Sequence, residues 1–406
     1  MFKNEFFKVL AATVVVAMVF IGCGQKYCDE SDFRIEPVDG GKAAKIVKYV
    51  GNKQTVNIPP RLQRLPVAAI GENAFVNEGS RWTDPSGMGI INVTIPNGVT
   101  TIEDGAFYGN QLTSINIPNS VTTIGRQAFE SNQLTNVNIG NRVSEIGYRA
   151  FAENQLLSVN IPNSVTAIGG RAFAENELTT INIPSSVTEI GRGAFAGNPL
   201  TKFSVASGNN SYSVKNFFLL SKDGTELIEY LGNEKEIAVP NGIITIGAEA
   251  FMNNWLTSVT IPEGVTTIEN SAFWGNRLTS VTIPSSVVTI KANAFAGNNL
   301  TNVTIPNGVV TIGSSAFSDN RLTSVTVSNS VKKLEGGTFR NNPLTIITIG
   351  ANVEFGTNCD FGCNFEREYN NNGRLGGTYA KQSVIRTRQG FMGTMQNREM
   401  AWVKQQ

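Results

Sequence analysis

A mainly β solenoid is predicted for this chain, in which parallel strands stack one coil upon the next. An aromatic marker recurs through most of its 406 residues, and eight of its ten intervals are 22 residues long. Charged residues make up only 16%, and Gly, Asn, Ser and Thr are abundant, as expected for strands and tight turns. A fixed period of this size is the signature of a solenoid. The markers are Phe75, Phe107, Phe129, Phe151, Phe173, Phe195, Phe251, Phe273, Phe295, Phe317 and Phe339.

One coil can be followed in residues 110–131, NQLTSINIPNSVTTIGRQAFES. Ile115 and Ile117 alternate with Ser114 and Asn116, which predicts a half-buried strand. The segment SVTTIG predicts a second short extended piece, and RQAFESN predicts a turn or a short helical corner. Each 22-residue unit therefore makes one coil.

A glycine ends the second extended piece in most coils. Glu103, Glu269, Lys291 and Glu335 stand at the same place in other coils. A position that required positive φ would not readily accept four charged substitutes. We therefore predict that glycine is favourable at this position but not required by it.

The repeated skeleton Leu-x-x-Leu-x-Leu-Pro-x-x-Leu-x-x-Ile-x-x-x-Ala-Phe resembles the BspA-like, or treponemal, leucine-rich repeats over about residues 32–352. The resemblance implies a curved leucine-rich repeat solenoid with parallel strands, short helical or 3-10 corners and β-rich caps, most often on a bacterial surface. An asparagine column replaces the cysteine usual in that family, and we expect it to satisfy backbone groups of the turns. It consists of Asn110, Asn132, Asn154, Asn176, Asn198, Asn254, Asn276, Asn298, Asn320 and Asn342.

Two breaks in the period and the two ends suggest the domain organisation. Residues 225–240 match residues 44–59 in their apolar, charged and Gly-Asn positions, so a module that begins the solenoid returns in its middle. There it either extends a coil beside a hairpin at Lys222-Asp223-Gly224 or forms a hinge. The predicted units are 1–22 signal peptide, 23–31 linker, 32–75 N-terminal capping module, 76–198 repeats, 199–250 long variant repeat, 251–352 repeats and 353–406 C-terminal cap and tail.

The N-terminus predicts export. Lys3 and Lys8 precede an apolar run of thirteen residues, 9–21, which is shorter than the roughly 20 residues that a membrane span needs. The run ends in Phe-Ile-Gly-Cys, which resembles the lipobox of bacterial lipoproteins and implies lipidation of Cys23. An ordinary signal peptide cut near Gly22, or an uncleaved anchor, are the alternatives. The prediction is an exported, lipid-anchored protein of the bacterial outer membrane or cell surface, held to the membrane by its N-terminal lipid only.

Composition argues against several kinds of chemistry. The chain has no histidine, so it lacks the commonest general base and zinc ligand, and no phosphate-binding loop or nucleophile elbow is found. A net charge of +1 gives no field to gather nucleic acid. We predict no enzyme activity, no cofactor, no metal and no nucleic-acid partner. Glu130, Glu153 and Glu175, each near an arginine, are predicted to lie at solvent positions.

Four cysteines are present, and two of them lie close together near the end of the repeats. In an exported protein Cys359 and Cys363 are predicted as a local disulfide. Cys28 has no obvious mate in the sequence.

Partner contacts are predicted on two kinds of surface. The outward residues of the main strands run from Thr113, Ser114 and Asn116 to Thr323, Ser324 and Thr326, and are expected to form an uncharged sheet of about twelve strands. Such a face suits an extended polypeptide or a glycan. The alternative is that threonine is simply a good strand residue.

The second surface is aromatic and lies at the coil corners. Trp255 and Arg277 occupy the same place in adjacent coils, which predicts a cation–π pair, and Met252 and Trp274 share another corner column. Trp82 lies in a polar insertion between the first two markers. The alternative is that the corner tryptophans only pack against their neighbours.

The functional prediction is a binding protein, adhesin-like, whose partner is a protein or glycan on a host or neighbouring cell. It comes from the resemblance together with the anchor. A self-associating structural protein of the cell envelope is the alternative, and a carboxylate-dependent enzyme is a remote one.

Overall fold

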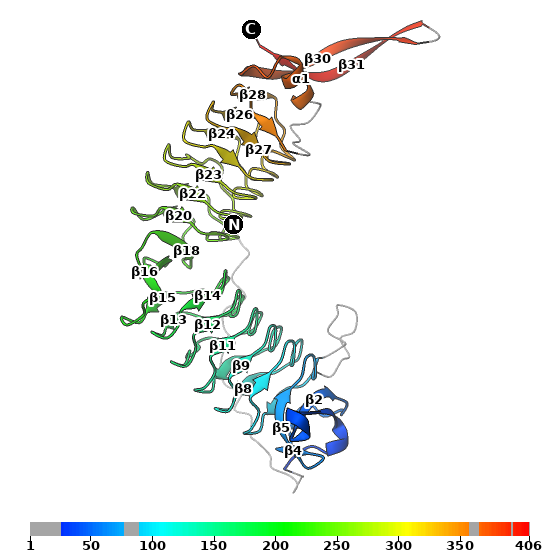
Figure 1. Cartoon of the computed structure of the whole chain (residues 1–406), viewed down its shortest axis with the longest axis vertical. Coiled ribbons are helices and arrows are strands. Elements are labelled where there is room, and N and C mark those ends of the chain that lie inside the picture. Colours follow the sequence, from blue (N-terminus) through cyan, green and yellow to red (C-terminus); the bar gives the residue numbers. More distant parts are fainter. Residues whose placement is uncertain (1–25, 77–88, 357–364, 391–392, 406) are drawn as a thin grey trace, which may run out of the picture.

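The computed structural model describes residues 26–76, 89–356, 365–390 and 393–405. These residues form one curved solenoid whose coils follow the chain in order (Figure 1). Parallel pairing between coils repeats every 22 residues, as in Glu145 with Ala167 and Ala167 with Glu189. The predicted mainly β solenoid is confirmed.

The N-terminal end begins with a small antiparallel unit. Strand β1 pairs antiparallel with β2, and β2 pairs parallel with β5, on which the first coils stack. The elements are η1 (Glu30–Asp32), β1 (Phe33–Val38), η2 (Asp39–Gly41), β2 (Ala43–Tyr49), β3 (Thr55–Asn57), β4 (Arg61–Leu62) and β5 (Leu65–Ile70). Because Phe33 and Ile46 are buried, this unit covers the open end of the apolar core.

Continuous pairing lies on the face made by the second extended piece of each coil. The first nine-stranded sheet follows the order β1-β2-β5-β7-β9-β11-β12-β14, with β4 beside β5. Its repeat strands contain two residues each, of which the second points inward and is buried or nearly so. They are β7 (Thr101–Ile102), β9 (Thr123–Ile124), β11 (Glu145–Ile146), β12 (Ala167–Ile168) and β14 (Glu189–Ile190).

A second nine-stranded sheet begins after a break. It follows the order β16-β17-β18-β20-β22-β23-β25-β27-β29 and opens with antiparallel strands, as the first sheet does. Its strands are β16 (Tyr212–Lys215), β17 (Phe218–Ser221), β18 (Glu226–Tyr230), β20 (Thr245–Ile246), β22 (Thr267–Ile268), β23 (Thr289–Ile290), β25 (Thr311–Ile312), β27 (Lys333–Leu334) and β29 (Glu354–Phe355).

The face expected to carry one sheet of about twelve strands is instead divided. Its strands pair in groups of two, except near the C-terminus, where a five-stranded sheet forms. The expectation of one continuous sheet was wrong, because the coils pair without interruption through the other face. The strands are β6 (Asn92–Thr94), β8 (Ser114–Asn116), β10 (Asn136–Asn138), β13 (Thr180–Ile183), β15 (Lys202–Val205), β19 (Glu236–Ala238), β21 (Ser258–Thr260), β24 (Asn302–Ile305), β26 (Ser324–Val327) and β28 (Ile346–Ile349).

The marker phenylalanines stack inside the corners of the coils. From Phe75 to Phe195, and again from Phe251 to Phe339, successive ring centroids lie 4.9–5.8 Å apart, with nearly parallel planes. All eleven rings are buried. The corners that hold them are turns rather than helices. The repeated aromatic residue is therefore structural.

The asparagine column makes the same hydrogen bonds in nine coils. Asn154 donates its amide to the carbonyls of Phe129, Phe151 and Ala152 at 2.9–3.2 Å, and its Oδ1 accepts the Leu134 N–H at 3.0 Å. One side chain thus satisfies backbone groups of neighbouring coils, which confirms the role predicted for this column. The exception is the tenth asparagine of the column, Asn254, which follows the break in the period.

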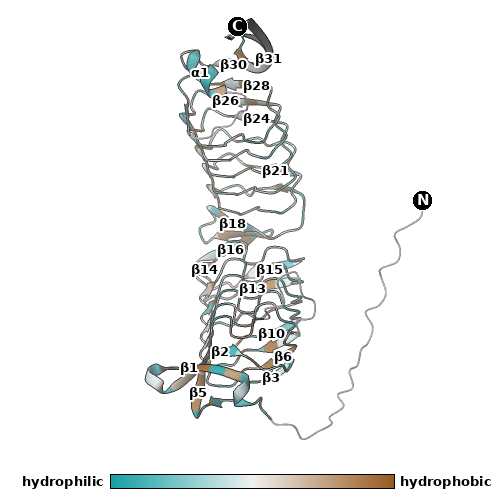
Figure 2. Ribbon diagram, turned by 90° about the vertical axis from the view of Figure 1, so that its right-hand side faces the viewer, coloured by the Kyte–Doolittle hydropathy of each residue, from teal (hydrophilic) through white to brown (hydrophobic). Residues whose placement is uncertain are grey.

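The apolar core is divided where the period breaks. One cluster of buried side chains ends with Leu219 and Leu231, and the next begins with Phe218 and Leu220. Consecutive residues of β17 therefore face different cores. Figure 2 shows β16 and β18 between the two stacks of coils.

The C-terminal end closes the second core. Helix α1 (Phe365–Asn371) and strands β30 (Gly377–Gly390) and β31 (Gly393–Lys404) follow the last coil, and β30 pairs antiparallel with β28 over four residues. Tyr369, Tyr379 and Trp402 are fully buried against that core. The tail thereby covers apolar surface that the last coil would otherwise expose.

Candidate binding surfaces

The outward strand residues lie where the sequence places them, but part of their hydrogen-bonding capacity is used inside the stack. Thr113 and Asn116 are exposed. The Thr135 hydroxyl donates to the Thr113 carbonyl at 3.2 Å, the Thr323 hydroxyl makes the equivalent bond to Thr301 at 3.4 Å, and the Asn138 amide donates to Asn116 Oδ1 at 2.6 Å. These contacts hold adjacent coils together. Ser114, Ser324 and Thr326 complete the predicted set, with Ser324 partly buried.

The aromatic corner is more distinctive. The Arg277 guanidinium lies 4.3 Å from the centre of the Trp255 ring, so the two residues form the cation–π pair that the sequence predicts. Trp255 remains 53% exposed and Trp274 38%. Trp255 also has a φ of 60°, a left-handed conformation that costs energy for a bulky side chain. The fold thus holds an exposed tryptophan on a strained backbone.

Met252 lies near the junction of the two cores. Its sulfur is 3.7 Å from Nη2 of Arg171, a residue of the first stack of coils. Met252 is partly buried. Its described contact is therefore made across the junction, and it joins the two halves of the solenoid.

Four predicted residues cannot be placed. Cys23, Trp82, Cys359 and Cys363 lie outside the described residues, so their lipidation, exposure and pairing stay predictions. Cys28 is described, and its thiol is free and buried, 3.9 Å from the Thr55 carbonyl oxygen.

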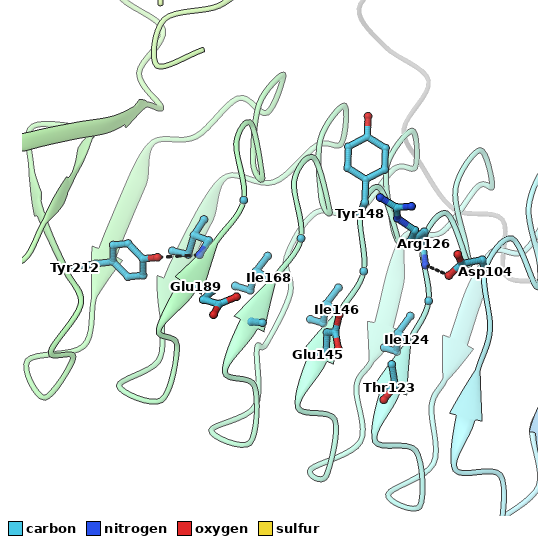
Figure 3. Close-up of a pocket in the computed structure, with 16 residues that line it drawn as sticks. Asp104, Thr123, Ile124, Arg126, Glu145, Ile146, Tyr148, Ile168, Glu189 and Tyr212 are labelled. Carbon is cyan, nitrogen blue, oxygen red and sulfur yellow. Dashed lines mark hydrogen bonds between the residues drawn. The ribbon is translucent and has the colours of Figure 1, made fainter. Parts of the chain in front are cut away.

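A groove that the sequence reasoning missed runs along the continuous sheet of the first half. It has a volume of about 690 Å³ and is lined by successive coils from Asp104 to Tyr212 (Figure 3). A second hollow of about 400 Å³ lies beyond it and shares Ile190 and Tyr212 with it. The two hollows follow one face of the sheet across the junction as far as Glu269.

Glycines make the floor of this groove. Gly125, Gly147, Gly169 and Gly191 have no positive φ, as the sequence predicts. A Cβ at Gly125 or Gly147 would, however, lie 2.6 Å from the backbone of the preceding coil. The prediction that glycine is not required at this position was therefore wrong for this half, because the missing side chains let adjacent coils approach closely. Four consecutive coils with glycine at this place are the sequence signal for the groove.

Charge in the groove is mostly negative. Glu145 and Glu189 are exposed on β11 and β14, and Glu226 is exposed at the start of β18. Within the described part of the chain, none of these three carboxylates has an ion-pair partner. Asp104 accepts the Arg126 N–H at 2.7 Å, and the Arg126 guanidinium lies over the Tyr148 ring. Uncompensated carboxylates favour a cationic ligand.

The second half differs at the same place. Lys291 and Glu269 replace glycine in adjacent coils and form an ion pair at 2.6 Å. The glycine-floored groove is thus a local feature and not a property of every coil.

One carboxylate expected at the surface is buried. Glu130 is only 3% exposed and accepts a hydrogen bond from Nε of Arg149 at 2.6 Å. The prediction of a solvent position was wrong for Glu130, because Arg149 of the next coil folds over it. Glu153, in the next coil, is exposed and also contacts Arg149.

A second buried carboxylate lies at the junction. Glu229 is 5% exposed, its Oε2 has no hydrogen-bond partner, and burial raises its pKa to about 8. Glu249 raises the pKa further, whereas Arg171 and the Phe195 N–H lower it.

Two further features bear on the class of protein. No helix within the described ranges is both long and apolar enough to cross a membrane. No group of three or more acidic or cysteine side chains in the same ranges is arranged to hold a metal ion.

The repeated coils and their stacked phenylalanines define a leucine-rich repeat scaffold. The model of the BspA type leucine rich repeat region matches residues 86–202 and 229–366, in six copies. The chain belongs to the BspA-type leucine-rich repeat family. The resemblance seen in the sequence is thereby confirmed.

Solved structures share the fold. The pneumococcal vaccine antigen PcpA is 22% identical with a TM-score of 0.58, and 78% of this chain and 85% of that chain are covered. A leucine rich cell surface protein from Faecalibacterium prausnitzii is 26% identical with a TM-score of 0.57, covering 83% and 98%. A leucine-rich repeat protein from Eubacterium ventriosum is 22% identical with a TM-score of 0.57, covering 80% and 91%. No curated protein matches the chain.

Proposed function

We propose that this protein is an exported, lipid-anchored binding protein of the bacterial surface, adhesin-like, with a protein or glycan of a host or neighbouring cell as its partner. Membership of the BspA-type family supports the surface location. The similarity to the leucine rich cell surface protein from Faecalibacterium prausnitzii supports it as well. The lipobox-like sequence ending at Cys23 supports the anchor.

One observation carries the proposed binding role: the exposed pair of Trp255 and Arg277, with an exposed Trp274 in the coil that contains Arg277. Tryptophan and arginine are the residues most enriched among binding hot spots. The apolar core does not need Trp255, because the ring is more than half exposed and its column elsewhere holds residues such as Gln133. Strain kept at an exposed aromatic residue is better explained by a ligand than by stability.

The binding test compares two variants of the full chain on immobilised matrix proteins and on cells. Trp255→Ala with Trp274→Ala is expected to weaken saturable binding at least about tenfold, the effect of losing one hot spot. Leu157→Ala is the matched control, because Leu157 is also an exposed apolar residue, at 59%, in the other half. Unchanged binding together with a lower melting temperature would show that the tryptophans only pack.

The anchor has its own test. Mass spectrometry of the mature N-terminus is expected to find acyl groups on Cys23, and Cys23→Ser is expected to release the protein from membranes. An unmodified Cys23 would remove the anchor from the proposal and leave the binding role standing.

A self-associating envelope protein is the second function, and the C-terminal strands favour it. Strands β30 and β31 pair with each other over twelve residues, whereas only four residues of β30 pair with the solenoid. Association of the purified protein without any added ligand would support this function.

A further inference from the structure

The two C-terminal strands form a ribbon that extends past the end of the solenoid. Residues 381–390 of β30 lie beyond the part that pairs with β28, and β31 is the last strand of its sheet. Figure 1 shows this ribbon reaching away from the last coil. At about 3.4 Å per residue, its projecting part measures roughly 34 Å. A two-stranded ribbon alone is marginally stable in water and has open edges, so it gains from a partner.

The charge of the ribbon is opposite to that of the groove. Residues 377–406 contain five basic residues and one acidic residue, a net charge of +4, although the whole chain carries only +1. The two hollows are lined by five acidic residues and two basic residues, a net charge of −3, and the ion pair of Glu269 with Lys291 reduces the negative excess to −2. The acidic residues are Asp104, Glu145, Glu189, Glu226 and Glu269, and the basic ones are Arg126 and Arg192.

The length of the groove is also sufficient for the projecting part of the ribbon. From Asp104 to Glu269 the groove crosses about ten layers of backbone, which at about 4.8 Å per step gives roughly 43 Å. The projecting ribbon, at roughly 34 Å, is therefore shorter than the groove.

We propose that the groove of one molecule receives the C-terminal ribbon of a second copy. The ribbon extends away from the C-terminal end of the arc, whereas the groove runs from β7 to β22, so the contact joins two molecules (Figure 1). Two ribbons would repel each other through their like charges, which argues against a ribbon-to-ribbon dimer. Because the contact is heterologous, it repeats and builds a head-to-tail chain of molecules.

The test is sedimentation velocity of the purified protein in detergent, without added ligand. The protein is expected to form oligomers larger than dimers at about 20 mM salt and to dissociate at about 500 mM salt, since screening weakens exposed charge pairs. The groove variant is Glu145→Lys with Glu189→Lys, and the ribbon variant is Arg386→Glu with Arg388→Glu. Each alone is expected to weaken association at least tenfold.

Mixing supplies the decisive result. The groove variant keeps an intact ribbon and the ribbon variant keeps an intact groove, so an equal mixture is expected to associate again. Glu177→Lys with Glu236→Lys is the matched control, since both residues are exposed and lie outside the groove, and it is expected to associate like the unaltered protein. Circular dichroism checks that every variant is folded.

Three results would overturn the proposal: a monomer at low salt, association unchanged in the groove variant, or no recovery on mixing. Association lost only in the ribbon variant would indicate a different acidic surface as the docking site. Since Trp255 lies outside the groove, adhesive binding measured with Trp255→Ala is independent of every one of these results.

Discussion

The Tyr212 hydroxyl accepts the Ile190 N–H at 2.8 Å and donates to the Thr188 carbonyl at 3.1 Å. Strand β14, which contains Ile190, is the last strand of the first sheet, so its outer edge has no neighbouring strand. The Tyr212 hydroxyl thus satisfies two backbone groups that a neighbouring strand would otherwise pair, and it joins the two sheets. The solenoid is continuous as a chain, but its sheets are divided between β14 and β16 and its cores at β17.

Removing that hydroxyl should weaken the junction. Tyr212→Phe leaves the Ile190 N–H and the Thr188 carbonyl without their partner, which should lower the free energy of unfolding by about 1–3 kcal/mol. Urea denaturation followed by circular dichroism measures this. Tyr148→Phe is the control, because Tyr148 is exposed, and it should change stability by less than about 0.5 kcal/mol. Equal stability of the two variants would contradict a structural role for the Tyr212 hydroxyl.

Glu229 should make stability depend on pH. Its pKa is raised from 4.5 to about 8 because burial disfavours the carboxylate. The folded protein therefore keeps a proton that the unfolded chain loses above pH 4.5, and the free energy of unfolding falls as the pH rises towards 8, by an amount on the order of a few kcal/mol. Glu229→Gln should remove this fall and should be more stable than the unaltered protein at pH 8. If the free energy of unfolding changed with pH by the same amount in the two proteins, Glu229 would not titrate in this range.

The stability of the protein should depend on both the charge and the size of the side chains in the asparagine column. Asn154→Ala leaves the Leu134 N–H unpaired and removes one of the two donors to each of three carbonyls, and a loss of about 1–3 kcal/mol is expected. Asn154→Asp should be at least as harmful, because a carboxylate cannot donate to those carbonyls. Asn299→Ala, at a partly exposed position outside the column, is the control in thermal melts. An aspartate variant as stable as the unaltered protein would be inconsistent with amide donation.

The Trp255–Arg277 pair should show measurable coupling. A double-mutant cycle with Trp255→Ala and Arg277→Ala should give an interaction free energy of about 0.5–1 kcal/mol, as for exposed cation–π pairs. Acrylamide should also quench tryptophan fluorescence more strongly in Arg277→Ala, because the guanidinium shields one face of the ring. If the stability losses of the two single variants simply added up to that of the double variant, the contact would contribute no net stability.

Sequence periodicity was sufficient for the features that repeat. The spacing of Phe107 and Phe129 predicts a stacked core, and the position of Asn132 predicts a side chain that satisfies turn backbone; both are confirmed. Arg277 and Trp255 were paired correctly because adjacent coils bring residues 22 apart into contact. Local pattern and a fixed repeat together determine these contacts.

Features that depend on departures from the repeat were not predicted. Strands of two residues, such as Thr123–Ile124, are too short for alternation to reveal, so the continuous sheet was assigned to the wrong face. Burial of Glu130 depends on how Arg149 of the next coil folds over it. The bonds of Tyr212 and the burial of Glu229 depend on how the inserted strands meet the preceding coil, which no repeat specifies.

Surface exposure of the whole solenoid is the claim on which the proposed function depends. Intact bacterial cells that produce the protein can be treated with protease, and the fragments released can be identified by mass spectrometry. We predict peptides from both stacks of coils, including the segment around Trp255, while the cells remain unlysed. Complete protection of the protein in intact cells, with digestion only after lysis, would contradict an outward-facing binding protein.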